Sequence, residues 1–194
     1  NREWSRMDVE ALLEHHRRFF NTQATRGVDF RLKQLKALKR GLKKHEQAIY
    51  GALKQDLGKH KNEAYMTELG FLYASLSNTI RNLKRWDRQE KRRTPLFLMP
   101  ASSYLVQEPY GTVLILGAYN YPVQLLLEPL IGAIAAGNTA VLKTSELASH
   151  TAAAIRQMIQ DTFEDSYVTC IEGGPETGDA LIHGAFDYIF FTGS

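Results

Sequence analysis

A single cysteine, Cys170, is present among the 194 residues, so no disulfide can form within the chain. Long apolar runs are also missing: the longest, from Val123 to Ala136, is interrupted by Gln124, Glu128 and Pro129 and is too short to span a bilayer. The N-terminus lacks the basic and then apolar pattern of a secretory signal. These absences predict a reducing, cytoplasmic compartment.

The second half of the chain has almost no basic residues. Residues 1–100 contain 22 Lys and Arg against 11 Asp and Glu, whereas residues 101–194 contain 2 against 10. A basic first half fits a surface that binds nucleic acid, a surface that binds an anionic membrane, or a solvated helical face. Because its basic residues are separated by apolar ones at helical spacing, we interpret it as a solvated face and expect no nucleic-acid partner.

Apolar residues recur at helical spacing through residues 1–100. Positions from Leu35 to Leu57 share one side of a predicted helix, which Gly58 would end. A second helix is predicted from about Asn62, with an apolar face formed by Met66, Leu69, Leu72, Tyr73, Leu76, Ile80 and Leu83. Pro95 and Pro100 then mark a boundary near residue 100. We therefore predict two parts, an N-terminal helical segment (1–100) and an α/β part (101–194).

Strand and helix patterns alternate after residue 100. Ser103–Gln107 alternates like a half-buried strand, whereas continuous apolar runs, typical of strands buried on both faces, occupy 112–116, 139–142, 167–171 and 188–191. Helical segments near 123–136, 149–163 and 176–182 separate these four runs. The order predicts an α/β fold with a parallel sheet covered by helices on both faces.

The strand at 188–191 has a predicted place in that sheet. In the usual doubly wound order it lies beside strand 112–116, on the side away from the other two strands. This place would leave it with an unpaired backbone edge, and the chain is expected either to associate with itself through this edge or to hold it disordered.

Ligands of such sheets bind beyond the carboxyl ends of the strands, and polar residues follow each of the four apolar runs. The amide of Asn120, just before Tyr121-Pro122, fits either a cap of the next helix or a donor to a substrate oxygen. Lys143 and Glu146 fit either a structural ion pair or a nucleotide ribose, with the ammonium donating and the carboxylate accepting. The Gly-x-Gly-x-x-Gly phosphate loop of an ordinary dinucleotide-binding fold is absent after the first strand.

Several segments resemble one known family. Residues 109–122 (PYGTVLILGAYNYP) are similar to the aldehyde dehydrogenase signature around its WNYP core, and the matches continue in order at 132–138 (GAIAAGN), 142–146 (LKTSE), 173–174 (GG) and 190–194 (FFTGS). The resemblance covers residues 30–194, and residues 30–38 (FRLKQLKAL) are similar to class 3-like members. The chain thus resembles the N-terminal portion of a class 3-like, NAD(P)-dependent aldehyde dehydrogenase. The resemblance implies a partial, Rossmann-like nucleotide-binding sheet after the helical segment.

The resemblance also implies roles for individual residues. Asn120 matches the catalytic asparagine whose amide stabilises the oxyanion formed when a cysteine attacks the aldehyde. Lys143 and Glu146 match the pair that holds the adenosine ribose of the cofactor, NAD or NADP. Further cofactor-binding positions are Ala118, Tyr119, Gly193 and Ser194. The family's own turn, which begins at Gly193, takes the place of the usual phosphate loop, and no metal is implied.

Two departures leave the preference between NAD and NADP open: Tyr119 stands where tryptophan is common, and Thr144 where proline is common. The family's nucleophilic cysteine and general-base glutamate lie further along its sequence than the matched residues, so this chain by itself is expected to be inactive. Cys170 is not that nucleophile, because it lies within an apolar strand, where a thiol is inert.

For the complete enzyme, the resemblance implies oxidation of fatty or aromatic aldehydes to carboxylic acids through a cysteine thiohemiacetal and thioester. It also implies a homodimer, and membrane association is left open for the complete enzyme alone. Two alternatives remain: a CoA-acylating aldehyde dehydrogenase, and a non-catalytic basic module that binds nucleic acid.

Overall fold

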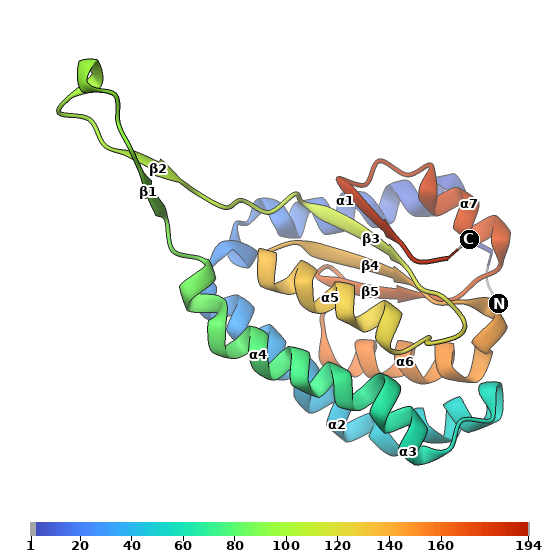
Figure 1. The fold of residues 1–194 in the computed structure, drawn as a ribbon. Helices are drawn as coiled ribbons and strands as arrows, with labels where there is room; N and C mark the ends of the chain where they lie inside the picture. The colour runs from blue at the N-terminus through green and yellow to red at the C-terminus, as the bar shows by residue number, and fades with distance from the viewer. Residues whose placement is uncertain (1–2, 194) are drawn as a thin grey trace.

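The computed structural model describes residues 3–193 and shows helices packed around a small sheet, with a long arm projecting from one end (Figure 1). The first half contains α1 (Arg6–Asn21), α2 (Val28–Leu57), α3 (Lys61–Ala64), a π-helical segment (Tyr65–Leu69), α4 (Gly70–Trp86) and β1 (Glu90–Arg92). The second half contains β2 (Ser103–Leu105), β3 (Thr112–Leu116), α5 (Gln124–Ala136), β4 (Thr139–Lys143), α6 (Ser149–Thr162), β5 (Val168–Ile171), α7 (Pro175–Ile182) and β6 (Tyr188–Phe191). Single 3₁₀ turns lie at Ala24–Arg26, Leu96–Leu98 and Glu146–Ala148.

Local sequence signals account for the ends of the first helices. Ser5 begins α1 with a capping box, in which its hydroxyl accepts from the Asp8 N–H at 3.2 Å and its own N–H donates to the Asp8 carboxylate at 3.0 Å. Gly58 ends α2 as predicted, with a φ of +66° that glycine adopts without strain.

A π-helical segment interrupts the second predicted helix. The Gly70 N–H bonds to the Tyr65 carbonyl, and a Cβ at position 70 would lie 2.7 Å from that oxygen. The prediction that Met66 lies on the buried face is wrong, because Met66 is 78% exposed. Glu68, two residues later, is fully buried. The wider π turn rotates the residues of this segment relative to the α-helical period from which the prediction was made.

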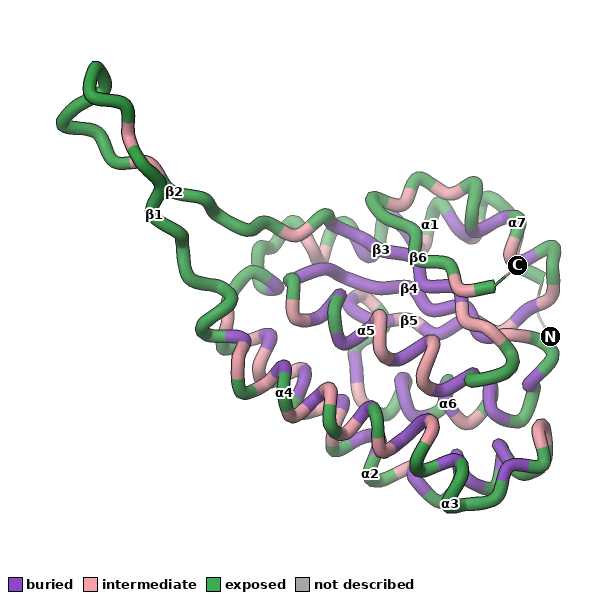
Figure 2. Tube along the Cα trace, in the orientation of Figure 1, coloured by how far each residue is buried: buried purple, intermediate pink, exposed green. Residues whose placement is uncertain are grey.

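The sheet has the predicted order, β5-β4-β3-β6, and all of its strands are parallel. Thr112 pairs with Thr139 at the start of β3 and β4, and Val113 pairs with Tyr188 of β6. Strands β3, β4 and β5 are buried, whereas β6 is exposed along its length (Figure 2). Among the described residues β6 pairs with β3 alone, so it is an edge strand as predicted.

Helices cover both faces of the sheet (Figure 1). On one face α5 and α6 lie against the strands, and α2 and α4 pack outside them around a core that includes Leu38, Leu72, Leu126 and Ile155. On the other face α1 and α7 form a smaller core with the strands. Residues from both sides of position 100 share the larger core. The division into two parts at residue 100 stays a prediction.

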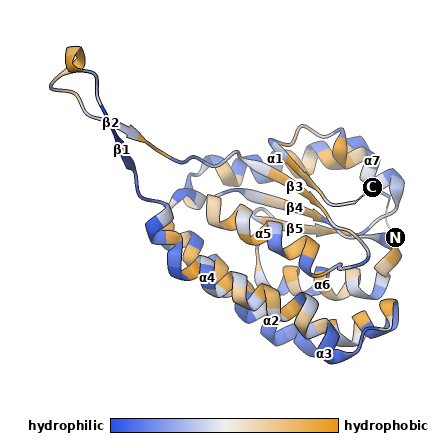
Figure 3. Ribbon diagram, in the orientation of Figure 1, coloured by the Kyte–Doolittle hydropathy of each residue, from blue (hydrophilic) through white to orange (hydrophobic). Residues whose placement is uncertain are grey.

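The strand predicted at Ser103–Gln107 is present as β2, but it lies in the arm and is mostly exposed, so the prediction of half burial is wrong. Strand β2 pairs antiparallel with β1 alone, in a ribbon that leaves the body of the molecule (Figure 1). The ribbon does not pack on the core, and Tyr104, Leu105 and Val106 are exposed. Strand β1 is hydrophilic, whereas the tip of the arm is apolar (Figure 3), and the exposed residues there are Leu96, Phe97, Leu98 and Met99.

Within residues 3–193, none of the helices combines the length and the apolar character needed to cross a membrane. The cytoplasmic location stays a prediction.

Candidate active site at the carboxyl edge of the sheet

The turns that follow the parallel strands begin side by side at one edge of the sheet. The Gly117 N–H after β3 donates to the Lys143 carbonyl at 3.0 Å, and the Thr144 N–H after β4 donates to the Ile171 carbonyl at 3.1 Å. On the other side of β3, the Thr192 N–H donates to the Leu116 carbonyl at 3.3 Å. The structure therefore brings the residues predicted after β3, β4 and β6 to a common edge, as parallel strands require.

Asn120 lies in the turn after β3, and its side chain is held by a single backbone contact. Its Oδ1 accepts a hydrogen bond from the Tyr121 N–H at 3.0 Å. Because an amide nitrogen cannot accept a hydrogen bond, this contact assigns the oxygen and leaves Nδ2 on the other side of the amide. Among residues 3–193 no group accepts from that Nδ2, and the residue is exposed. The geometry suits donation to an external acceptor.

Asn120 does not cap α5, so one of its two predicted roles is excluded. Helix α5 begins at Gln124, and its N-cap residue Val123 makes no side-chain cap. The carboxylate of Glu68, far away in the sequence, accepts from the Val123 N–H at 2.8 Å and from the Gln124 N–H at 3.2 Å. Glu68 lies in the π-helical segment, whose wide turn brings it to this helix end.

Lys59 completes a buried cluster beneath the Asn120 turn, and sequence reasoning missed both Lys59 and Glu68. Lys59 Nζ lies 2.6 Å from Glu68 Oε1 and donates to the Asn120 carbonyl at 2.7 Å. The same ammonium lies 4.1 Å from the centre of the Tyr121 ring, within cation–π range. Lys59 is 7% exposed and Glu68 0%. The sequence offered a signal for Glu68 alone, as a charged residue inside an apolar helical pattern, because Lys59 lies between the two predicted helices.

This cluster gives a physical reason for the missing phosphate loop. In an ordinary dinucleotide-binding fold, the free N–H groups at the start of the first helix bind the pyrophosphate. Here the first N–H groups of α5 already donate to a buried carboxylate. These N–H groups are therefore not free to bind a phosphate at this helix start.

Lys143 and Glu146 form an ion pair at the end of β4. Lys143 Nζ lies 2.8 Å from Glu146 Oε2, and the lysine is buried while the glutamate is partly exposed. The hydrogen bond from Lys143 lowers the pKa of Glu146 despite partial burial, so the carboxylate is charged at neutral pH. The structural ion pair is present, and it places a cation and an acceptor together at the ligand edge.

The other predicted cofactor-binding residues lie at the same edge. Ala118 is half-buried and Tyr119 is exposed in the turn after β3. Gly193 follows β6 with a φ of +159°. Ser194 lies outside the described residues. Among residues 3–193, no group of three or more His, Cys, Asp or Glu side chains is placed to bind a metal ion.

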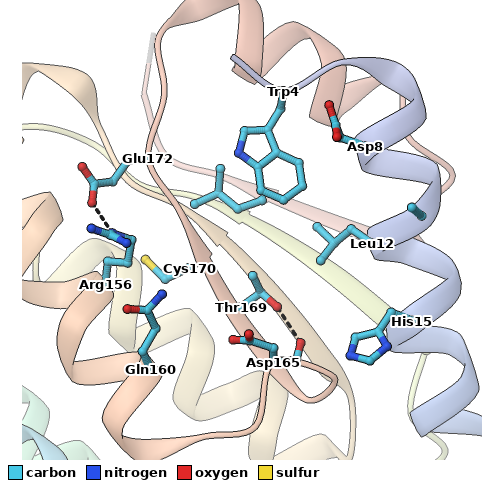
Figure 4. Close-up of a pocket in the computed structure, with 12 residues that line it drawn as sticks. Trp4, Asp8, Leu12, His15, Arg156, Gln160, Asp165, Thr169, Cys170 and Glu172 are labelled. Atoms are coloured by element: carbon cyan, nitrogen blue, oxygen red, sulfur yellow. Dashed lines mark hydrogen bonds and ion pairs between the residues drawn. The ribbon is translucent and has the colours of Figure 1, made fainter. Parts of the chain in front are cut away.

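Cys170 lies near the end of β5, but its thiol is buried. It lines a hollow of about 640 Å³ between α1, α6 and β5, near the Arg156–Glu172 ion pair (Figure 4). Burial, with a smaller effect of Glu172, raises the pKa of its thiol to about 12. The thiol is therefore protonated at neutral pH and a poor nucleophile.

Many basic residues of the first half have acidic partners. Lys43 pairs with Glu46 on α2, Lys44 pairs with Asp161 of α6, and buried Arg31 pairs with Asp87. These pairs reduce the free positive charge of the helical face.

Comparisons with a family profile, with curated proteins and with solved structures all match aldehyde dehydrogenases. The profile of the Aldehyde dehydrogenase family matches residues 2–194. The chain is 50% identical over 186 residues to 4,4'-diaponeurosporen-aldehyde dehydrogenase of Staphylococcus aureus, covering 96% of this chain and 40% of that protein. It is 41% identical over 186 residues to aldehyde dehydrogenase family 3 member F1 of Arabidopsis thaliana, covering 96% and 38%. A solved structure titled as the substrate-bound state of Staphylococcus aureus AldH superposes with a TM-score of 0.94 at 49% identity, covering 96% and 41%.

The fold defines an α/β protein with a parallel sheet and polar residues at the carboxyl edge of that sheet. The profile match defines the family. The chain belongs to the aldehyde dehydrogenase family, and its relatives include class 3 members, as the motifs predicted. It spans about two fifths of the length of the relatives it matches.

Proposed function

We propose that a protein of the relatives' full length that contains this chain oxidises an aldehyde to a carboxylic acid with NAD(P)+. In this proposal Asn120 is the oxyanion donor of the reaction. The observation that carries it is the fixed amide of Asn120, whose Oδ1 is engaged by the Tyr121 N–H while Nδ2 remains available at the ligand edge. A preorganised donor of this kind stabilises negative charge that develops on a substrate oxygen.

Lys143 and Glu146 are proposed to hold the adenosine ribose of the cofactor. The ion pair fits a ribose because the charged carboxylate accepts from hydroxyl groups and the neighbouring ammonium donates. When bound, NAD(P)+ would supply the hydride acceptor. Ala118, Tyr119 and Gly193 would line the cofactor cleft. The phosphates would lie away from α5, since Glu68 occupies its N-terminus.

The nucleophile is assigned to a residue outside this chain, because the raised pKa of Cys170 keeps its thiol protonated. The 194-residue chain would then contribute the oxyanion donor and part of the cofactor cleft. The substrate is proposed to be a fatty or aromatic aldehyde. Since one relative is named for 4,4'-diaponeurosporen-aldehyde, that long apolar aldehyde belongs among the substrates to be tested.

We also propose that the full-length protein is a homodimer and that the arm contributes to its interface. Four apolar residues at the arm tip are exposed, in a ribbon that extends beyond the body of the molecule (Figure 3). Apolar patches of this kind commonly mark protein–protein contacts.

The test is an assay of the full-length protein with these aldehydes, following NAD(P)H formation. Asn120→Ala should lower kcat by roughly 10² to 10³, the usual cost of losing one oxyanion donor. An unchanged kcat, with the chemical step shown to limit the rate, would remove Asn120 from the mechanism. Product analysis with and without CoA distinguishes the alternatives: a carboxylic acid supports the proposal, and an acyl-CoA supports a CoA-acylating enzyme. Retention on DNA or RNA at low salt, without any oxidation, would favour the nucleic-acid-binding alternative.

A further inference from the structure

The buried Lys59–Glu68 ion pair contacts the turn that contains Asn120. Both of its side chains are enclosed, with 8% and 0% of their surface exposed. Charges inside a protein are unfavourable unless each is paired and hydrogen-bonded. Both conditions hold here: Glu68 accepts from Lys59 and from two N–H groups of the α5 start, and Lys59 donates to Glu68 and to the Asn120 carbonyl. An arrangement with every charged oxygen and the ammonium engaged is rigid.

We propose that Lys59 and Glu68 are positioning residues that hold Asn120 in the orientation in which its Nδ2 amide faces the ligand edge. This inference rests on the role proposed above for Asn120. Neither residue is proposed to touch substrate or cofactor, since both are buried.

The contacts fix the turn from two sides. Lys59 holds the Asn120 carbonyl at 2.7 Å and faces the Tyr121 ring at 4.1 Å, so it restrains the peptide between these residues. The N–H of that same peptide donates to Asn120 Oδ1 at 3.0 Å and thereby orients the amide plane. Movement of Lys59 would therefore rotate the peptide and carry the amide with it.

Glu68 acts one step further away. It fixes the position of Lys59 through the 2.6 Å contact and anchors the turn at its far end, through the Val123 and Gln124 N–H groups. The turn is thus held at Asn120 by the cation and at Val123 by the carboxylate. A purely structural pair would also join α5 to the helical segment, but the orientation of Asn120 would not depend on it.

The two roles differ in a double-mutant cycle with Asn120, measured in the full-length protein. Lys59→Met removes the donor while keeping most of the side-chain length, and Lys61→Met, at a nearby exposed lysine, is the matched control. If Lys59 acts through Asn120, Lys59→Met lowers kcat by about 10- to 100-fold, as small misplacement of a catalytic group can do. The KM for the cofactor should change little, and Lys61→Met should leave kcat unchanged.

The decisive comparison is made in the Asn120→Ala background. There Lys59→Met should cause almost no further loss, because the group that it positions is absent. Equal losses in both backgrounds would overturn the proposal and leave Lys59 a structural residue.

A second measurement does not depend on activity. In the 194-residue chain, Lys59→Met should shift the side-chain amide resonances of Asn120 and speed hydrogen exchange at the Tyr121 N–H, while Lys61→Met should do neither. Unchanged Asn120 and Tyr121 signals in Lys59→Met would refute the positioning role. If the full-length protein oxidises no aldehyde, the proposed function fails, yet this measurement still decides whether Lys59 positions Asn120.

A variant without either buried charge distinguishes the loss of positioning from a loss of folding. The double variant Lys59→Met/Glu68→Gln removes both buried charges, while the glutamine oxygen can still accept from the α5 N–H groups. It should fold and show the same kcat loss and the same Asn120 shifts as Lys59→Met. A folded neutral pair with wild-type kcat and wild-type Asn120 signals would overturn the proposal.

Discussion

Replacement of Asp56 tests whether the helical segment stabilises the α/β part by capping a helix from outside it. Helix α6 has no side-chain cap of its own, since its N-cap residue is Ala148. Asp56, in the last turn of α2, accepts from the Thr151 N–H at 2.7 Å and the His150 N–H at 3.2 Å, and lies 2.7 Å from the His150 ring Nδ1. Its side chain is 5% exposed.

The expected cost of Asp56→Ala follows from these contacts. A hydrogen bond to a charged group contributes about 1.5–3 kcal/mol, and the two N–H groups at the start of α6, one of them exposed and one part-buried, lose their acceptor. A carboxylate at the end of α2 is itself disfavoured by that helix dipole by about 0.3–1 kcal/mol, which its removal recovers. The free energy of unfolding should fall by about 3 kcal/mol, and Tm by about 6–12 °C for a chain of this size. Asp56→Asn should cost less, because one acceptor oxygen remains.

The effect should also depend on pH. Burial raises the pKa of Asp56, but the hydrogen bonds from Thr151 and His150 outweigh it and hold the pKa below its usual value. A carboxyl group with a lower pKa in the folded state stabilises the fold above its unfolded pKa, and this contribution is lost as pH falls through the folded value. The difference between wild type and Asp56→Ala should therefore be complete at neutral pH and shrink below about pH 4.

The assay is urea unfolding of the 194-residue chain, followed by circular dichroism at several pH values. Gln55→Ala is the matched control, because Gln55 is exposed in the same helical turn and should change stability by less than about 0.5 kcal/mol. An Asp56→Ala variant as stable as Gln55→Ala, or a difference that does not diminish in acid, would refute the capping argument.

Three further predictions concern function and association. In the full-length protein, Lys143→Ala should raise the cofactor Kd about tenfold or more, given about 1.5–3 kcal/mol for a hydrogen bond to a charged group; equal Kd values in titration calorimetry would leave Lys143 with its ion pair alone. The 194-residue chain should produce no NAD(P)H from aldehydes, because the raised pKa keeps Cys170 protonated; sustained production that Cys170→Ser abolishes would contradict this. Phe190→Lys, on exposed edge strand β6, should reduce self-association of the chain in sedimentation experiments, and a wild-type chain that is monomeric at high concentration would remove the reason for it.

Much of the α/β part could be predicted from the sequence. The strands Thr112–Leu116 and Tyr188–Phe191 have the predicted bounds, and the sheet order is as expected. Strands that are buried on both faces have continuous apolar sequences, and parallel connections permit few arrangements. Local pattern and topology are therefore enough to predict these strands and their order. Asn120 and Lys143 were found for the same reason, because Asn120 follows β3 and Lys143 ends β4.

The errors arose where the pattern had more than one structural solution. Met66 has the spacing of a buried helical residue, but the π-helical turn changes the period and exposes it. The alternation at Ser103–Gln107 describes a strand correctly, yet alternation does not say whether a core lies beneath it, and here none does.

The sequence by itself determined the strands, their order and the residues at the carboxyl edge, since these depend on apolar runs and chain connectivity. Only the tertiary structure decided how the starts of α5 and α6 are satisfied. Their acceptors are Glu68 and Asp56, 55 and 95 residues away from Val123 and Thr151. Neither carboxylate lies near the helix that it caps in the sequence. Asp56 lies in the last turn of α2, where the dipole of that helix disfavours a negative charge. A local pattern cannot contain such a contact, because it exists only after the helical segment has packed against the sheet.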